Sequence, residues 1–245
     1  MNIETLYEDN DLIVVNKPAG MLVVPDRFNS DLPSLGKQVE KKIGQRIWVV
    51  HRLDRDTSGV ICFAKNEETH RYLSICFQER DVNKFYAALV VGVVIPESGR
   101  IENYLTEHPA GNGRMMVAKR GKLAVTDYKV VEQWPLYALM QFQIHTGRTH
   151  QIRVHMRSIG HPIVCDEVYG DGKPFKLSAI KRKYKLSEKE EEEKPLLSRL
   201  ALHAYKLEFH KEDGTPVSVE APLPKDIAAC VKQLNKWCPP ANTQD

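Results

Sequence analysis

The chain has 245 residues, of which 42% are hydrophobic, enough for one large mixed domain or two small ones. No apolar run approaches the ~18 residues needed to span a membrane. The opening residues Met1–Thr5 lack the basic and apolar parts of a signal segment, so we expect a cytoplasmic protein. The five scattered cysteines argue against a disulfide framework or a zinc knuckle. A net charge of +3 permits a nucleic-acid partner without indicating one.

The predicted elements mix strands and helices along the chain. In chain order we first expect a hairpin over 6–20, a helix over 35–43 ended by Gly44, and a helix over 67–78 capped by Asn66. Strands over 84–94, 122–133 and 137–145 follow, and then a helix over 149–159 that buries Ile152, Met156 and Ile159. The chain is expected to end with a hairpin over 200–219 and a last helix after Pro224 with Ile227, Val231 and Leu234 inward. Strands outnumber helices and several are neighbours in sequence. The sequence therefore predicts an α+β fold with a largely antiparallel sheet.

The segment His51–Val60 concentrates charge between two apolar runs. It holds two carboxylates, two guanidiniums, an imidazole and two hydroxyls, which is too much charge to bury unpaired. We therefore expect a loop held by a strand on either side, a position from which catalytic groups are often presented. A salt-bridged surface turn is the plainer interpretation of the composition alone.

The order of residues in this loop, His-Arg-Leu-Asp-x-x-Thr-Ser-Gly, resembles the signature of the pseudouridine synthases. The leading His is typical of the RluA branch, which modifies ribosomal and transfer RNA, whereas the small-subunit branch typically has Gly there. Further segments match the family in order, at 6–20, 84–92, 145–155, 161–164, 169–170, 202–204 and 221–224. This ordered set of motifs is far more specific than any one of them.

The resemblance implies a curved mixed sheet with helices outside it and a central RNA-binding cleft. It implies a single catalytic domain over residues 1–245, without the separate N-terminal RNA-binding domain that many relatives carry. Segment 171–198 is longer than the family minimum, so we expect a surface insertion there. Cys165 stands where relatives more often have Gly, which bears on the geometry of that turn.

The resemblance also implies roles for individual residues. Asp54 is the catalytic aspartate, acting as a nucleophile on the sugar or first as a base, and both remain open. Arg153 pairs with Asp54 and favours its ionised form. Tyr86 stacks on the flipped uracil or shuttles a proton. The RNA-binding residues that it implies are Arg52, which fills the gap left by the extruded base, and His51, Arg148 and His150, which contact the RNA backbone or hold the loop.

Two other functions deserve comparison. Asp54-Arg55-Asp56 could be mistaken for a magnesium-dependent phosphatase loop, but the polar pair His51-Arg52 interrupts the strand that should precede it. A non-catalytic RNA-binding protein on the same fold is the second alternative. Intact Asp54, Tyr86 and Arg153 count against it.

No metal or cofactor is expected. His145, His150 and His155 are five residues apart, which places neighbours about 140° apart on a helix, so they share no face. The reaction implied by the resemblance involves no redox step. The expected partner is structured ribosomal or transfer RNA, with no membrane, and we expect a monomer.

Overall fold

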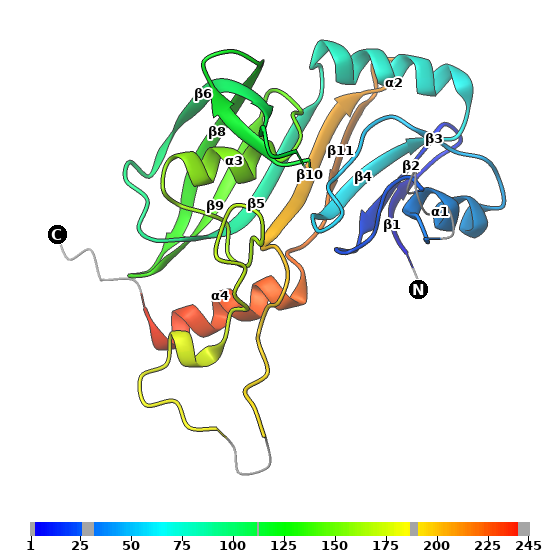
Figure 1. The fold of residues 1–245 in the computed structure, drawn as a ribbon. Coiled ribbons are helices and arrows are strands. Elements are labelled where there is room, and N and C mark those ends of the chain that lie inside the picture. Colours follow the sequence, from blue (N-terminus) through cyan, green and yellow to red (C-terminus); the bar gives the residue numbers. More distant parts are fainter. Residues whose placement is uncertain (1–2, 26–31, 112, 187–190, 240–245) are drawn as a thin grey trace. The chain divides into compact units, whose positions relative to one another are not determined.

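The computed structural model describes residues 3–25, 32–111, 113–186 and 191–239 (Figure 1). The chain forms two compact units. Unit 1 comprises Met1–Tyr86 and His203–Pro222, and unit 2 comprises Ala87–Leu202 and Leu223–Asp245. Strand β5 (Asn83–Val91) crosses from the first unit to the second, so that Tyr86 is the last residue of its segment of unit 1.

Unit 1 is built on a mixed arrangement of strands. Its strands besides the start of β5 are β1 (Glu4–Glu8), β2 (Leu12–Lys17), β3 (Trp48–Val49), β4 (Ser58–Ala64), β10 (Leu202–His210) and β11 (Pro216–Glu220). Strand β4 pairs antiparallel with β2 and with β3, and parallel with the start of β10. The pairs β1–β2 and β10–β11 are antiparallel hairpins. Strand β4 is buried along its whole length, as expected for a strand with neighbours on both edges.

Two helices belong to unit 1, and local signals in the sequence set their ends. Helix α1 (Leu35–Ile43) ends at Gly44, which takes a left-handed φ of 72°. Helix α2 (Glu67–Glu79) begins after Asn66, whose side-chain oxygen accepts the Thr69 N–H at 2.8 Å. The buried face of α2 packs its Leu73 and Cys76 against β2, β4 and β10 in one hydrophobic cluster. Val50, just before the loop that precedes β4, also packs against this cluster.

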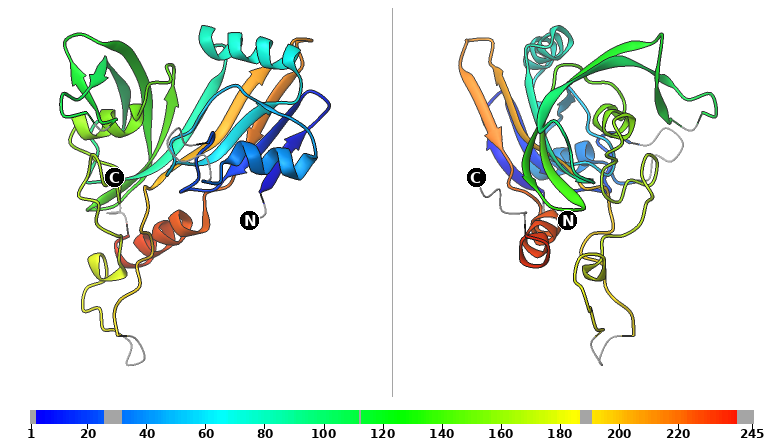
Figure 2. Two further views of the ribbon diagram at one scale, coloured as in Figure 1. Left: turned by 45° about the vertical axis from the view of Figure 1, so that its right-hand side comes forward. Right: turned by 90° about the vertical axis from the view of Figure 1, so that its left-hand side faces the viewer.

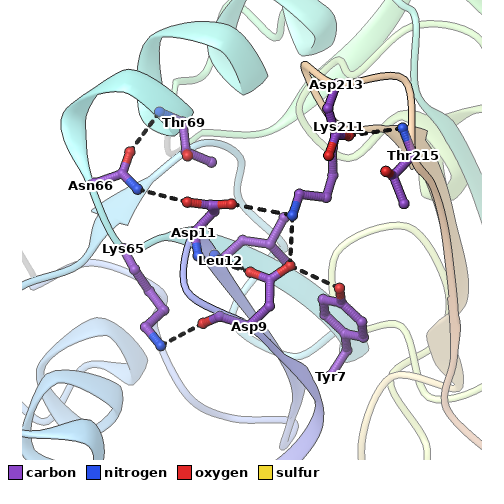
Figure 3. Close-up of polar contacts among 10 residues, drawn as sticks. All are labelled: Tyr7, Asp9, Asp11, Leu12, Lys65, Asn66, Thr69, Lys211, Asp213 and Thr215. Atoms are coloured by element: carbon purple, nitrogen blue, oxygen red, sulfur yellow. Dashed lines mark hydrogen bonds and ion pairs between the residues drawn. The ribbon is translucent and has the colours of Figure 1, made fainter.

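A charge network fastens the two hairpin turns of unit 1 together (Figure 3). The Lys211 ammonium lies 3.0 Å from Asp9 Oδ2 and 3.2 Å from Asp11 Oδ2. Tyr7 donates to Asp9 at 2.8 Å, and Asn66 donates to Asp11 at 3.2 Å. Burial opposes ionisation of Asp9, but backbone and side-chain hydrogen bonds prevail and lower its pKa to about 2. The network therefore stays charged at neutral pH and holds the β1–β2 hairpin, whose far end leads into the candidate site.

The described strand pairs within unit 2 are antiparallel. Its elements besides the rest of β5 are β6 (Ser98–Glu107), β7 (Met115–Ala118), β8 (Lys122–Gln133), β9 (Tyr137–Ile144), α3 (Gln151–Ser158), the short 3₁₀ helix η1 (Leu177–Ala179) and α4 (Lys225–Trp237). Strand β6 pairs with β7 and β8, and β8 pairs with β9. Helix α3 packs its Val154 against Leu105 and Ala124 of these strands. The expected α+β class with a largely antiparallel mixed sheet and flanking helices is confirmed.

Three details differ from the expectations. Strand β5 ends at Val91, before the expected Val94, because Gly92 takes a left-handed φ of 91°. Helix α3 begins later than expected, at Gln151, and its C-cap Ile159 is 38% exposed where a buried residue was predicted. In α4 the buried cysteine Cys230 takes the inward place that was predicted for Val231. Each error lies at the end or on the flank of an element, where the periodic pattern is weakest.

Segment 171–198 belongs to unit 2, with its residues 187–190 outside the described part. The turn before it contains Cys165, whose φ of 60° lies in the left-handed region that glycine adopts without strain. The turn thus has the geometry that a glycine would favour, although a buried cysteine occupies it. The single catalytic domain over 1–245 and the insertion at 171–198 stay predictions.

Candidate active site

The charged segment predicted as a loop lies between β3 and β4 in unit 1, as expected. A turn closes it, in which the Thr57 N–H donates to the Asp54 carbonyl at 3.2 Å. Leu53 and Thr57 are buried, Asp54 is half-buried and Arg52 is exposed. The buried neighbours Leu53 and Thr57 thus anchor the turn, while Asp54 stays partly exposed.

A buried lysine fastens this loop to the end of β2. Lys17 is fully buried, and its ammonium donates to the carbonyls of Pro18, Met21 and Arg55 at 3.0, 2.8 and 2.8 Å. Gly20 N–H donates to the same Arg55 carbonyl at 2.8 Å. A buried ammonium is tolerable only when such acceptors surround it. The charge of Lys17 therefore fixes the backbone one residue after Asp54.

His51 holds the head of the loop from within unit 1. Its Nε2 accepts the Cys62 N–H at 3.1 Å, and its ring stacks on Phe77 with centroids 4.4 Å apart. Burial, and secondarily the charge of Lys84, lowers the pKa of His51 to about 3. The imidazole is therefore neutral, and the contacts observed are structural. The RNA contact of His51 stays a prediction.

The Ser58-Gly59 pair joins the end of the loop to β10. Ser58 Oγ lies 3.0 Å from His203 Nδ1, and His203 Nε2 lies 3.3 Å from the Ala221 carbonyl. A Cβ on Gly59 would lie 2.0 Å from the Ala204 carbonyl oxygen, and Gly59 has a φ of +120°. Only glycine fits there, because the parallel strand β10 approaches so closely.

Tyr86 lies in unit 1 with Asp54. Its side chain is buried, with 9% of the residue exposed. Burial, and secondarily the negative charge of Asp54, raises the pKa of Tyr86. The phenol is therefore protonated at neutral pH and lies within electrostatic reach of the carboxylate. Unit 1 thus contains the predicted pair Asp54 and Tyr86, together with Arg52 and His51.

The predicted Arg153 lies in unit 2, where its partner is a residue that the sequence did not indicate. Its guanidinium donates to both carboxylate oxygens of Asp166 at 2.8 Å, with side chains 8% and 0% exposed. Asp166 also accepts the N–H groups of Val168 and Tyr169 at 2.9 Å. Burial opposes its ionisation, but these bonds prevail and lower its pKa. The predicted pairing of Arg153 with Asp54 stays a prediction.

Polar contacts also fix the two other RNA-binding candidates of unit 2. His150 has a left-handed φ of 54°, and its Nδ1 lies 2.9 Å from the hydroxyl of Tyr169. That hydroxyl also accepts the Met115 N–H at 2.8 Å. Arg148 is half-buried and donates to the Leu123 carbonyl at 2.9 Å. Both side chains therefore hold the start of α3, and their RNA contacts stay predictions.

Sequence reasoning missed Lys17, Asp166 and His203, although Lys17 and His203 lay in segments that were matched to the family. Their roles depend on contacts with residues 38, 13 and 145 positions away. The only local signal was a charged residue inside or beside an apolar run, as in Lys17 after the strand Leu12–Asn16. Such a residue must have a partner if it is buried.

Within the described residues, no group of three or more His, Cys, Asp or Glu side chains is arranged to hold a metal ion. The part of the chain that the structure describes also has no helix long and apolar enough to cross a membrane.

The chain is similar in sequence to a family of known proteins. A family model described as RNA pseudouridylate synthase matches residues 11–158. "Ribosomal large subunit pseudouridine synthase D" of Neisseria meningitidis serogroup B is 40% identical over 233 residues, covering 93% of this chain and 60% of the relative. An "Uncharacterized RNA pseudouridine synthase" of Chlorobaculum parvum is 40% identical over 248 residues, covering 95% of this chain and 74% of the relative.

Among solved structures, "Human RNA Pseudouridylate Synthase Domain Containing 1" superimposes with a TM-score of 0.74 at 27% identity. The match covers 100% of this chain and 91% of that one. The chain spans about 60% of the length of the Neisseria relatives that it matches.

Proposed function

The chain belongs to the RNA pseudouridylate synthase family, and from this premise we propose that it isomerises specific uridines in structured RNA, with Asp54 as the catalytic aspartate. The observation that carries the proposal is the presentation of Asp54. It is the half-buried carboxylate of a tightly fastened turn, and it lies within electrostatic reach of a protonated tyrosine. This arrangement suits a carboxylate that must stay ionised beside a group that can donate a proton.

The reaction breaks the bond from ribose to nitrogen, turns the base, and rejoins the ribose to carbon 5. No atoms are lost overall, because the hydrogen that leaves carbon 5 is replaced by one on nitrogen. Asp54 acts on the sugar or as a base, and the phenol of Tyr86 packs against the base or moves a proton. In the proposed mechanism, Arg153 favours the ionised form of Asp54 when the RNA is bound, and Asp166 holds the Arg153 side chain.

The names of the relatives favour ribosomal RNA as the substrate of this chain. Those of Neisseria and Pseudomonas aeruginosa are named for the large ribosomal subunit. Transfer RNA is the alternative substrate, and pseudouridine mapping of total RNA with and without this gene distinguishes the two. We further propose that the protein acts in the cytoplasm, as a monomer and without a metal or cofactor.

The test of the function is release of tritium from RNA labelled at carbon 5 of uridine. Isomerisation replaces the hydrogen at that carbon, so a synthase releases tritium, whereas a non-catalytic RNA-binding protein on the same fold binds the RNA and releases none. RNA binding without tritium release, on transcripts of both ribosomal and transfer RNA, would select the non-catalytic alternative.

Tyr86→Phe is expected to lower turnover by about 10²-fold or more while RNA affinity changes little. The substitution keeps the buried ring and removes the hydroxyl, whose pKa is raised by burial. Single-turnover tritium release and filter binding measure the two effects separately. A near-normal rate would assign Tyr86 to packing against the base.

Arg52→Ala is expected to impair turnover on structured RNA more than on RNA whose target uridine is already unstacked. Arg52 is exposed on the loop beside Asp54, where its planar guanidinium could occupy the place of an extruded base. Unstacking costs a few kcal/mol and falls away when the base is extrahelical. The comparison is tritium release from paired and open-loop substrates, with the exposed Arg71→Ala on α2 as control. An equal defect on both substrates would make Arg52 an ordinary phosphate contact.

A further inference from the structure

The described part of segment 171–198, here called the excursion, packs against the rest of unit 2 through apolar side chains. Phe175 and Leu197 are buried and paired, with the Phe175 N–H donating to the Leu197 carbonyl at 2.8 Å. The Phe175 ring meets Tyr137 edge-on at 5.1 Å between centroids. Ile180, farther along the excursion, is 5% exposed. The described part of the excursion is therefore docked on its unit by apolar contacts.

The excursion lies against the end of α4. Cys238 Sγ donates to the Ile180 carbonyl at 3.2 Å. The ammonium groups of Lys181 and Lys236 lie 4.4 and 5.0 Å from the centroid of the Trp237 ring. Figures 1 and 2 show η1 and α4 together at one end of unit 2, apart from α3. The structure thus brings cations from two distant parts of the sequence onto one surface.

We use the name basic patch for Lys181 and Lys236 at the Trp237 ring together with the cations near them in sequence, Arg182, Lys183, Lys185 and Lys232. All are exposed except Lys181, which is half-buried. None of them forms an ion pair with any described residue.

The acidic residues of the excursion do not neutralise the patch within the described part of the chain. The Glu193 carboxylate accepts the Ser178 N–H at 2.8 Å, and Asp171 faces Lys173 at 3.9 Å. Glu191 and Glu192 are exposed and form no ion pair with the described residues. Among the described residues, therefore, no carboxylate pairs with a cation of the patch, and Glu188 and Glu190 lie outside the described part.

We propose that the basic patch binds the phosphate backbone of the RNA substrate, outside the site where the uridine reacts. Unpaired cations gain affinity for RNA by releasing its condensed counterions. A protein partner would require a larger apolar core than the patch offers, because its exposed large apolar side chains are Trp237 and the neighbouring Leu186. That the RNA is a substrate rests on the proposed function, whereas the affinity for RNA does not.

The test neutralises the patch in the full chain and compares a variant of equal charge. The patch variant is Lys181→Gln, Arg182→Gln and Lys183→Gln. The control is Lys41→Gln, Arg71→Gln and Lys129→Gln, which removes three exposed cations elsewhere on the chain. Filter binding between about 50 and 200 mM salt measures affinity for a ribosomal RNA transcript. Thermal melting verifies that both variants fold.

The patch variant is expected to bind the transcript at least about tenfold more weakly near 0.1 M salt, with the slope of log affinity against log salt reduced by about two. Its turnover at saturating RNA should match that of the parent protein.

An unchanged salt slope, or an equal loss of affinity in the control variant, would overturn the proposal. Failure of the proposed function has a different signature, because the parent protein would then release no tritium. The loss of affinity in the patch variant would still be measurable in that case.

Discussion

Asp54→Asn is expected to lower isomerisation by about 10⁴-fold or more while leaving RNA affinity within a few-fold. The amide keeps the size of the carboxylate but can neither attack the sugar nor accept a proton. The backbone of the turn should persist, because the Lys17 ammonium and the Thr57 N–H hold backbone carbonyls of the loop, which the substitution leaves in place. The loss should therefore fall on the chemical step rather than on docking.

Asp56→Asn provides the matched control for this experiment. Asp56 lies on the same turn two residues later and is exposed to solvent. Both variants remove one negative charge from the same loop. Tritium release should therefore collapse only in Asp54→Asn, and filter binding should be similar in both. Substantial turnover in Asp54→Asn would exclude the proposed role of Asp54.

The parts of the fold that sequence reasoning predicted well depend on local rules. Asn66 caps α2 because its side chain reaches an N–H three residues later, and Gly44 ends α1 because it takes a left-handed φ without strain. The loop before β4 follows from the cost of burying unpaired charge between two apolar strands. None of these features requires knowledge of which distant segments meet.

The parts that were missed depend on contacts between distant segments. The parallel pairing of β10 with β4 brings His203 to Ser58 and makes Gly59 obligatory, yet nothing near Gly59 in the sequence indicates the partner strand. Likewise, Arg153 could be placed on a helix from its neighbours, but its partner Asp166 lies beyond the end of that helix. The spacing of residues cannot predict such partners, because it reports only one element at a time.

The buried pair Arg153–Asp166 leads to the second large expected effect. Asp166→Asn is expected to destabilise the protein by about 3–5 kcal/mol, because it breaks a bidentate pair whose side chains are 8% and 0% exposed. The amide also accepts the Val168 and Tyr169 N–H groups less strongly than a carboxylate. Urea denaturation measures the loss as a lower midpoint with an unchanged slope. The exposed pair of Arg100 with Asp127 is the comparison, and Arg100→Gln should cost much less.

The dependence on pH provides an independent check of the same pair. The pKa of Asp166 in the folded protein is lowered from its ordinary value of 3.8, so folding favours the ionised form. The pair therefore contributes its full stability above that ordinary value and loses it as pH falls through the lowered one. The difference in unfolding free energy between parent and Asp166→Asn should be constant near neutral pH and shrink below about pH 4. A difference that stayed constant down to pH 2 would show that Asp166 stabilises the turn by its shape rather than by its charge.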